Sequence, residues 1–409
     1  MNENYDVIVA GGGVAGVAAA LAAAKAGART AIIEKSVWWG GLATGGMIFI
    51  YLPLCDGCGN QVSAGLAEKL LHASIKYGPG NINPQWREPG SPVRYRTAFS
   101  PAGFVMAMDE LLEKHKIDLW LDTLVSGCTV KENRVTGLKV LNKSGKHPLT
   151  GRVVVDATGD AEIIRQAGGS FVEGANSLAM WAIQAMEHCG EPPVSGHKLS
   201  THIGSAINGQ IEPFSWNAPP NKRRGTNGRA VTEFVMDSRR WLREYYNRNY
   251  AEGVYNRENL YALTLPTMAQ FRRIARIVSR GGIPELGYNT PIDGSIGVSA
   301  DWCHSKVVQE IPFSAMLPEK VEGVIVAGRA IDASGYSWEL IRSIPAVAVS
   351  GEAAGTAAAM AAESNISPHL LPVRTLQDRL RLNGCLISMG EIGINYCDFR
   401  PVSADEKGH

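Results

Sequence analysis

The sequence predicts an α/β fold in which a parallel sheet is assembled from both ends of the chain, with an inserted α+β domain between them. Three observations support this. An apolar strand–helix–strand pattern lies near the start, a second apolar strand and a small-residue helix follow Gly323, and loops, tryptophans and tyrosines are frequent between about 175 and 315. A strand–helix–strand unit of this length places two parallel strands side by side. We expect a first part at 1–172, an inserted domain at 173–318 and a second part with a C-terminal helix at 319–409.

The length and composition are those of a globular protein. The 409 residues suit two domains at about 150 residues each. A hydrophobic share of 45% with 19% charged residues excludes wholesale disorder. Glycine is in excess, with 45 residues, and suits backbone that turns tightly or approaches a ligand closely. A net charge of +1 gives no overall field that favours nucleic acid or a membrane, so we expect neither as a partner.

Cysteine usage and apolar runs bear on the compartment. Seven cysteines, an odd number in a long chain, favour a reducing cytosol over a disulfide framework. The sequence has no run of 18 or more apolar residues, and its first residues lack the cationic start of a secretory signal. We therefore expect a cytoplasmic protein; a homo-oligomer is compatible with the sequence.

The first strand–helix–strand unit carries a dinucleotide motif. Residues 5–10 (YDVIVA) predict a buried strand, residues 14–26 a helix that is apolar all round, and residues 30–34 a second strand. Gly11-x-Gly13-x-x-Gly16 opens the helix directly after the strand, where its glycines allow a tight turn and close approach to a pyrophosphate. The helix N-terminus offers N–H groups to phosphates. Glu34, at the end of the second strand, would accept hydrogen bonds from ribose and repel the 2′-phosphate of NADP.

Later segments favour a long, flat ligand. Residues 40–46 (GGLATGG) are nearly bare backbone, which suits contact with a ligand more than packing. Residues 323–328 (GVIVAG) predict a second buried strand, and the helix expected at 344–362 has a favourable start at Ser343 and Pro345. An extended ligand could then lie between two helix N-termini. For a flavin, the second helix would stabilise negative charge at N1–C2=O when the ring is reduced.

Four separated motifs carry a family resemblance. They are IVAGGGVAG, then IIEK with GGLATGG, then DATGDA at 156–161, then VAGRAIDAS at 326–334 with IRSIPAVAVSGEAAGTAAA at 341–359. In this order they resemble the FAD-dependent oxidoreductases of the glutathione-reductase-like flavoprotein superfamily. More narrowly, they resemble the family grouped with the flavin subunit of heterodisulfide reductase. The resemblance implies a Rossmann-like FAD-binding domain built from both chain ends, with the insert as a substrate or cap domain.

The same resemblance implies which residues bind or shape the flavin site, with Val125 meeting the adenine through its backbone. The FAD-binding residues we expect are Gly11, Gly13, Val14, Ala15, Gly16, Glu34, Lys35, Gly40, Gly41, Leu42, Ala43, Thr44, Val125, Ala157, Thr158, Gly159, Gly328, Arg329, Asp332, Ile344 and Pro345.

The remaining pattern predicts ordinary elements. Residues 101–115 form an amphipathic helical pattern, and alternating segments near 117–130 and 134–141 resemble a hairpin or meander. Residues 151–157 predict a buried strand, and residues 376–384 a late helix.

The insert is basic and aromatic. Residues 221–280 contain 13 Lys and Arg against 5 Asp and Glu, which suggests an anionic or sugar-like substrate; a solvated helical face explains Arg239, Arg240 and Arg243 better. Arg272 and Arg276 are spaced to share one face of a helix expected over FRRIARIV. The resembling family has roughly R-x-x-R-R-I-x-G here, but this chain departs from it at two positions. A carboxylate clamp and a structural ion pair therefore both stay open.

Arg272 and Arg276 are our first candidates for catalysis or for positioning the substrate or flavin. Arg96, Tyr336 and Arg342 are weaker candidates. His202 and His304 could act as acids or bases, but nothing nearby singles them out.

The leading hypothesis is an FAD-dependent oxidoreductase that exchanges a hydride between flavin N5 and a small polar, anionic substrate, with an unidentified electron donor or acceptor. In a second hypothesis, Cys55 and Cys58 form a redox pair of a disulfide-coupled electron carrier; as a lone CxxC they lack the second pair of a zinc site, and no metal is expected. In a third, the basic insert of a flavin-bearing protein grips RNA or a partner, although the near-neutral total charge argues against it.

Overall fold

A parallel sheet made from both ends of the chain forms the centre of the molecule. The computed structural model describes residues 3–88, 90–186, 209–210, 223–253 and 255–399. The sheet runs in the order β5–β2–β1–β8–β7–β6, and β17 pairs with β8. Its parallel strands are β1 (Glu3–Ala10), β2 (Thr30–Ile33), β5 (Asp118–Trp120), β8 (Gly145–Asp156) and β17 (Val324–Val326). The α/β fold with a sheet from both chain ends is therefore confirmed.

The antiparallel part of the sheet is a meander. Strands β6 (Leu124–Lys131) and β7 (Arg134–Asn142) pair with each other, and β7 pairs with the first half of β8. The second half of β8 lies between β1 and β17 and pairs with both. Its apolar residues are therefore buried. The hairpin or meander predicted near 117–141 is thus correct from β6 onward, whereas β5 belongs to the parallel edge.

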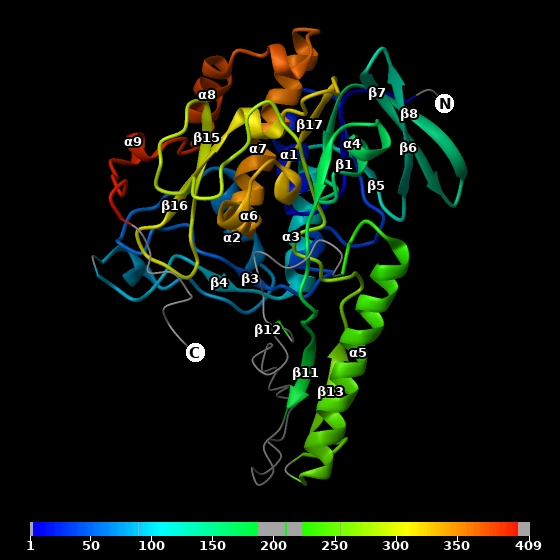
Figure 1. Cartoon of the computed structure of the whole chain (residues 1–409), viewed down its shortest axis with the longest axis vertical. Helices are drawn as coiled ribbons and strands as arrows, with labels where there is room; N and C mark the ends of the chain where they lie inside the picture. Colours follow the sequence, from blue (N-terminus) through cyan, green and yellow to red (C-terminus); the bar gives the residue numbers. More distant parts are fainter. Residues whose placement is uncertain (1–2, 89, 187–208, 211–222, 254, 400–409) are drawn as a thin grey trace.

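Two small-residue helices pack directly on each other beside this sheet. They are α1 (Val14–Lys25), which follows β1, and α7 (Ile344–Glu363), which follows β17 and also packs on β1, β8 and β15 (Figure 1). Nearly every residue of both is buried, as the uniformly apolar sequence predicts. Among the described helices, α7 alone is long and apolar enough to cross a membrane, and most of it is buried inside the fold.

Shorter elements complete this part of the molecule. The helices are α2 (Leu66–Ser74), α3 (Pro101–Lys114), α4 (Glu162–Gln166), α6 (Gly335–Ile341), α8 (Val373–Leu382) and α9 (Met389–Ile392). The strands are β3 (Ile50–Tyr51), β4 (Thr97–Ala98), β15 (Ser295–Ala300) and β16 (Val308–Pro312). Short 3₁₀ turns lie at η1 (Gly41–Ala43), η2 (Pro84–Arg87), η3 (Phe313–Met316), η4 (Gly328–Ala330) and η5 (Pro368–Leu370). The helices predicted at 101–115 and 376–384 correspond to α3 and α8.

The middle of the chain forms a long arm. Its longest element, α5 (Gly228–Ala251), extends away from the rest of the molecule beside strands β11 (Ile183–Met186) and β13 (Leu260–Thr264) (Figure 1). Strands β10 (Ala179–Met180) and β12 (Gly209–Gln210) form a second small pair. Asn227 caps α5, since its side chain accepts a hydrogen bond from the Ala230 N–H at 3.0 Å.

The helix predicted over FRRIARIV is wrong. Residues 275–277 form strand β14 (Ala275–Ile277), which pairs with β9 (Phe171–Glu173). The β-branched residues of this segment fit a half-buried strand, and the tertiary pairing overrides the i, i+4 spacing of the arginines. Arg272 and Arg276 consequently lie along an extended segment instead of one face of a helix.

Candidate cofactor and active site

A cavity of about 530 Å³ opens where the parallel strands end. Gly11 follows β1, Glu34 follows β2, Ala157 follows β8 and Ala327 follows β17, and all four line this cavity. The carboxyl edge of a parallel sheet is the usual binding edge of such folds. The volume lies within the range of about 300–1,000 Å³ that is typical of cofactor cavities.

The glycines before α1 let main chain face the cavity. Gly11 has φ of +98°, which favours glycine, and a Cβ at Gly16 would lie 1.8 Å from the Gly11 carbonyl oxygen. A Cβ at Gly13 would meet no described atom within 4 Å, because this position lines the open cavity. No side chain in the described part of the chain caps α1. Its first N–H groups therefore suit a pyrophosphate.

Glu34 presents its carboxylate at the edge of the same cavity. The Gly12 N–H donates to Oε2 at 2.7 Å and the Ser36 N–H donates to Oε1 at 2.9 Å. These two bonds fix a nearly buried carboxylate in the position where ribose hydroxyls can donate to it. Ser36 and Trp38 line the cavity beside it, and the sequence reasoning missed both. Their place directly after the strand that ends at Glu34 was the available signal.

The bare loop 40–46 forms another wall and is tied to the inserted segment. Gly40 has φ of +99°, and the buried Thr44 hydroxyl donates to the Trp39 carbonyl. The Thr267 N–H donates to the Gly45 carbonyl at 2.8 Å, and Gln270 Nε2 donates to the Gly46 carbonyl at 2.6 Å. The first and middle parts of the chain thus meet at this wall.

The DATGDA segment makes the turn after β8. Buried Asp156 accepts hydrogen bonds from the Thr158 hydroxyl at 2.6 Å and from the Ile163 N–H at 2.9 Å, and burial raises the pKa of its carboxyl group. Arg329 closes over this turn: its Nε donates to the Gly159 carbonyl at 2.7 Å, and Nη2 pairs with Asp160 at 2.8 Å. Thr158, Gly159, Asp160 and Arg329 all line the cavity.

Arg342 is the predicted catalytic candidate that lines the cavity, next to the first turn of α7. It ion-pairs with Glu339, and its guanidinium lies 5.4 Å from the ring centre of Trp302. Its buried Nε has no hydrogen-bond partner among the described residues. Burial, with nearby charges on three other arginines, holds the pKa of the Arg342 guanidinium well below its usual value. Ser343 caps α7, accepting from the Ala346 N–H.

The other predicted arginines lie elsewhere. Arg276 ion-pairs with Asp332, whose Oδ2 also accepts the Ser279 N–H at 3.0 Å, so these two predicted site residues bind each other. Arg272 lies 5.8 Å from the ring centre of Trp181, and burial lowers its pKa to about 9, with the Arg329 charge as a second cause. Neither arginine lines the cavity within the described residues.

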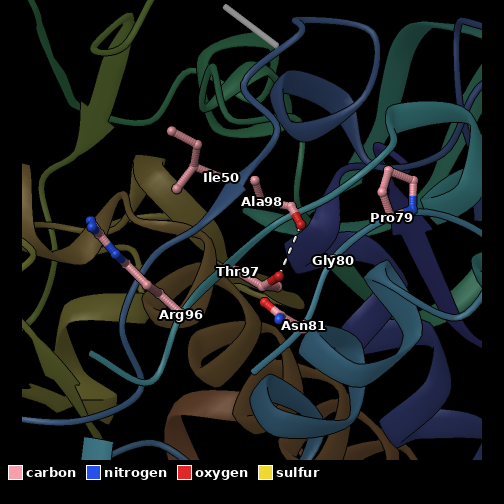
Figure 2. Close-up of a pocket in the computed structure, with 7 residues that line it drawn as sticks. All are labelled: Ile50, Pro79, Gly80, Asn81, Arg96, Thr97 and Ala98. Atoms are coloured by element: carbon pink, nitrogen blue, oxygen red, sulfur yellow. Dashed lines mark hydrogen bonds between the residues drawn. The ribbon is translucent and has the colours of Figure 1, made fainter. Parts of the chain in front are cut away.

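Arg96 belongs to a different groove. Figure 2 shows this exposed arginine beside Ile50, Asn81 and Thr97, which line a separate hollow of about 430 Å³. The Thr97 hydroxyl donates to the Ala98 carbonyl there at 2.9 Å. No residue in the described part of the chain lines both hollows, so the structure does not bring Arg96 to the cavity at the strand ends.

Tyr336, in the first turn of α6, belongs to a hydrogen-bonded cluster with Asp301 and His304. Its hydroxyl donates to the buried carboxylate of Asp301, which also bonds His304 Nδ1 at 2.9 Å. Burial and the Asp301 charge raise the pKa of the Tyr336 hydroxyl strongly. Tyr336 does not line the cavity among the described residues. His202 lies outside the described residues.

Most, but not all, of the expected FAD-binding residues line the cavity. Those that do are Gly11, Gly13, Val14, Ala15, Glu34, Lys35, Gly40, Gly41, Leu42, Ala43, Ala157, Thr158, Gly159, Gly328, Arg329 and Ile344. Those outside its described lining are Gly16, Thr44, Val125, Asp332 and Pro345. Further lining residues come from the inserted segment and were missed, among them Thr267, Met268, Phe271 and Ile274.

Cys55 and Cys58 are both free thiols, and neither lines the cavity among the described residues. Cys55 is fully buried and accepts the Tyr95 N–H. Within the described ranges no cluster of three or more His, Cys, Asp or Glu side chains could hold a metal ion.

The cavity thus fits an extended dinucleotide: uncapped N–H groups, a ribose-binding carboxylate and a glycine-lined channel lead to the start of a second helix. Comparisons agree. A model of the FAD-dependent oxidoreductase family matches residues 6–202 and 286–380. A digeranylgeranylglycerophospholipid reductase of Thermoplasma volcanium is 29% identical over 194 residues, which cover 44% of this chain and 46% of that protein. The match therefore spans about half the length of this curated relative.

A solved structure of a monooxygenase shares the fold at low identity. A p-nitrophenol 4-monooxygenase from Pseudomonas putida superposes with a TM-score of 0.51 at 14% identity, covering 93% of this chain and 84% of that one. A geranylgeranyl bacteriochlorophyll reductase-like protein from Thermoplasma acidophilum gives a TM-score of 0.46 at 17% identity, covering 96% and 95%.

Proposed function

This chain belongs to the FAD-dependent oxidoreductase family, and we propose that it exchanges a hydride between the flavin and a small anionic substrate held beside Arg342. It is thus an enzyme, and its cofactor is FAD. Bound FAD supplies the chemistry by accepting or donating a hydride at N5. The narrower relation to the heterodisulfide reductase flavin subunit stays a hypothesis.

Different residues of the cavity would hold different parts of FAD. The uncapped first turn of α1 would hold the pyrophosphate, and Glu34 would accept hydrogen bonds from the ribose. Loop 40–46 and the inserted wall with Phe271 and Ile274 would cover the ring and exclude water from it. The start of α7 would favour negative charge on the reduced ring, as helix N-termini do.

The environment of Arg342 is the observation that supports an anionic substrate. It is a cation that lines the cavity with only 16% of its side chain exposed, and its single described carboxylate partner, Glu339, also lies 3.5 Å from Arg273 Nε. A buried charge with incomplete compensation is costly, so an anion placed beside it is favoured. This arginine would position the substrate, and the flavin would do the redox chemistry.

The two rival hypotheses gain no support. Cys55 and Cys58 lie outside the described cavity lining. On the arm, Arg229 pairs with Glu233 and Arg240 with Asp237, which is the pattern of a solvated helical face.

A second candidate substrate is an unsaturated apolar chain. The curated relatives are named as reductases of digeranylgeranylglycerophospholipid. Strand β13 and the residue after it expose Tyr261, Leu263 and Leu265 in alternation, and the segment then reaches Thr267 and Met268 in the cavity wall. This apolar row favours a long substrate with its double bond at the flavin.

One assay separates these candidates. The enzyme-bound flavin is reduced anaerobically, and its reoxidation is followed with small unsaturated carboxylates, with their methyl esters and with a prenyl alcohol in detergent. The proposal predicts that the acids reoxidise the flavin at least tenfold faster than the esters and that Arg342→Met removes this preference. Arg381→Met, at a surface arginine paired with Asp378 and Glu391, is the matched control. Equal rates for acids and esters would exclude the anionic substrate, and reoxidation by the prenyl alcohol alone would favour the second candidate.

A further inference from the structure

Arg342 lies at the junction of two helices and is held from two sides. It is the residue directly after α6, and Ser343 then caps α7. On one side its guanidinium ion-pairs with Glu339, three residues earlier. On another side lies the indole of Trp302, at 5.4 Å from the ring centre to the guanidinium carbon, within the range of a cation–π contact.

Glu339 is a buried carboxylate whose described ion-pair partners are arginines. Its side chain is 5% exposed, and besides Arg342 it lies 3.5 Å from Arg273 Nε. A carboxylate buried to this degree is stable only when paired. It therefore fixes one edge of the Arg342 guanidinium and offsets part of its charge.

Trp302 is fixed by the residue before it. Asp301 is fully buried, and its Oδ1 accepts the Cys303 N–H at 2.6 Å. The Asp301 carbonyl accepts a hydrogen bond from Arg94 Nη2 at 2.8 Å. The main chain on both sides of Trp302 is therefore anchored, which limits where its indole can lie beside the guanidinium.

We propose that Glu339 and Trp302 are positioning residues that set the direction and the effective charge of Arg342 toward the flavin. They thereby set the balance between oxidised and reduced FAD. This inference rests on the proposed function, because it assumes that Arg342 acts on the flavin and its substrate. Neither residue lines the cavity among the described residues, so both would act through Arg342.

The two partners of the ion pair predict opposite effects. Reduction adds negative charge to the flavin, so Arg342→Met disfavours the reduced form, whereas Glu339→Gln removes a negative charge and favours it. We expect about a tenfold change in the equilibrium for each, which is about 30 mV for a two-electron couple, downward for Arg342→Met and upward for Glu339→Gln. Trp302→Leu frees the guanidinium and moves the potential in the same direction as Arg342→Met, while Trp302→Phe keeps an aromatic face and restores it.

The test is the two-electron midpoint potential of FAD in the purified holoenzyme, measured by reduction against a reference dye. Matched controls are Glu391→Gln, at an exposed carboxylate that pairs with Arg381, and Trp86→Leu, at a tryptophan that stacks on Tyr95. Bound flavin per chain and the melting temperature identify variants that fail to fold, and Trp302→Phe keeps the test open if Trp302→Leu fails.

The outcomes separate the two proposals. No shift in Arg342→Met would remove the role of Arg342 and with it the premise. Two outcomes would overturn the positioning role alone. In one, the potential falls in Arg342→Met but falls or stays unchanged in Glu339→Gln. In the other, the potential of Trp302→Leu equals that of the unchanged enzyme.

Discussion

Gly351 of α7 lies directly against the main chain of Ala15 in α1. A Cβ at Gly351 would be 2.3 Å from the Ala15 carbonyl oxygen, and one at Gly355 would be 2.0 Å from the Ala19 carbonyl oxygen. Such distances exclude any side chain larger than hydrogen. The two helices come from opposite ends of the chain, and this close approach brings their first residues, Val14 and Ile344, to one cavity.

The helix contact predicts a loss of stability on adding a methyl group. Gly351→Ala forces α1 and α7 apart, and overpacking of this kind costs about 1–3 kcal/mol. Gly228→Ala, at the start of α5 where a Cβ would meet no described atom within 4 Å, is the control. Urea unfolding with excess FAD measures both. Equal stabilities for the two variants would contradict the close packing.

The pyrophosphate site proposed at the first turn of α1 predicts a variant that folds but binds FAD poorly. Gly13→Ala places a methyl group in the cavity without a clash with the described protein atoms. We expect a melting temperature of the apoprotein close to that of the unchanged chain and at least a tenfold weaker affinity for FAD. Gly390→Ala, on the distant helix α9 with room for a Cβ, should change neither. Unchanged FAD affinity in Gly13→Ala would place the phosphates elsewhere.

The proposed contact between Glu34 and the ribose predicts that a substitution at Glu34 weakens cofactor binding. Hydrogen bonds to charged groups contribute about 1.5–3 kcal/mol, so Glu34→Gln should weaken FAD binding by about 10- to 100-fold in a fluorescence titration. Glu132→Gln, at an exposed turn between β6 and β7, serves as the control. A Glu34→Gln variant that binds FAD as tightly as the control variant would argue against a ribose contact.

The parts of the fold and of the site that local sequence patterns encode could be predicted, whereas the parts that depend on tertiary contacts could not. The strand, glycine motif and acid at Gly11–Glu34 are local, so the sequence predicted the cavity edge they form. The helix predicted from the spacing of Arg272 and Arg276 is wrong because a spacing of four also fits an extended segment. Strand β14 forms through its pairing with β9. The wall that includes Phe271 and Ile274 carries no motif. The nearby residues Thr267 and Gln270 bond to Gly45 and Gly46 in a distant segment, and a local sequence pattern does not encode such contacts.

Buried Glu352 predicts a pH dependence of stability. The Leu66 N–H donates to its Oε2 at 2.6 Å, and burial raises the pKa of the carboxyl group above its ordinary value of 4.5. The folded state therefore binds the proton more tightly than the unfolded chain, and this residue lowers stability as pH rises above about 4.5. Glu352→Gln keeps an acceptor oxygen and does not titrate. Its melting temperature should match that of the unchanged enzyme near pH 4 and exceed it at pH 7, whereas Glu363→Gln, at the exposed end of α7, should show no such divergence. A Glu352→Gln variant less stable at pH 7 than at pH 4, relative to the unchanged enzyme, would contradict this.

The most direct test of the proposed FAD site is an experimental electron-density map of the FAD-loaded enzyme. We expect the pyrophosphate against the first N–H groups of α1 and the flavin ring between loop 40–46 and the start of α7, with Arg342 facing it. Density that places the ring away from Ile344 and Arg342, or FAD outside the cavity at the strand ends, would contradict it.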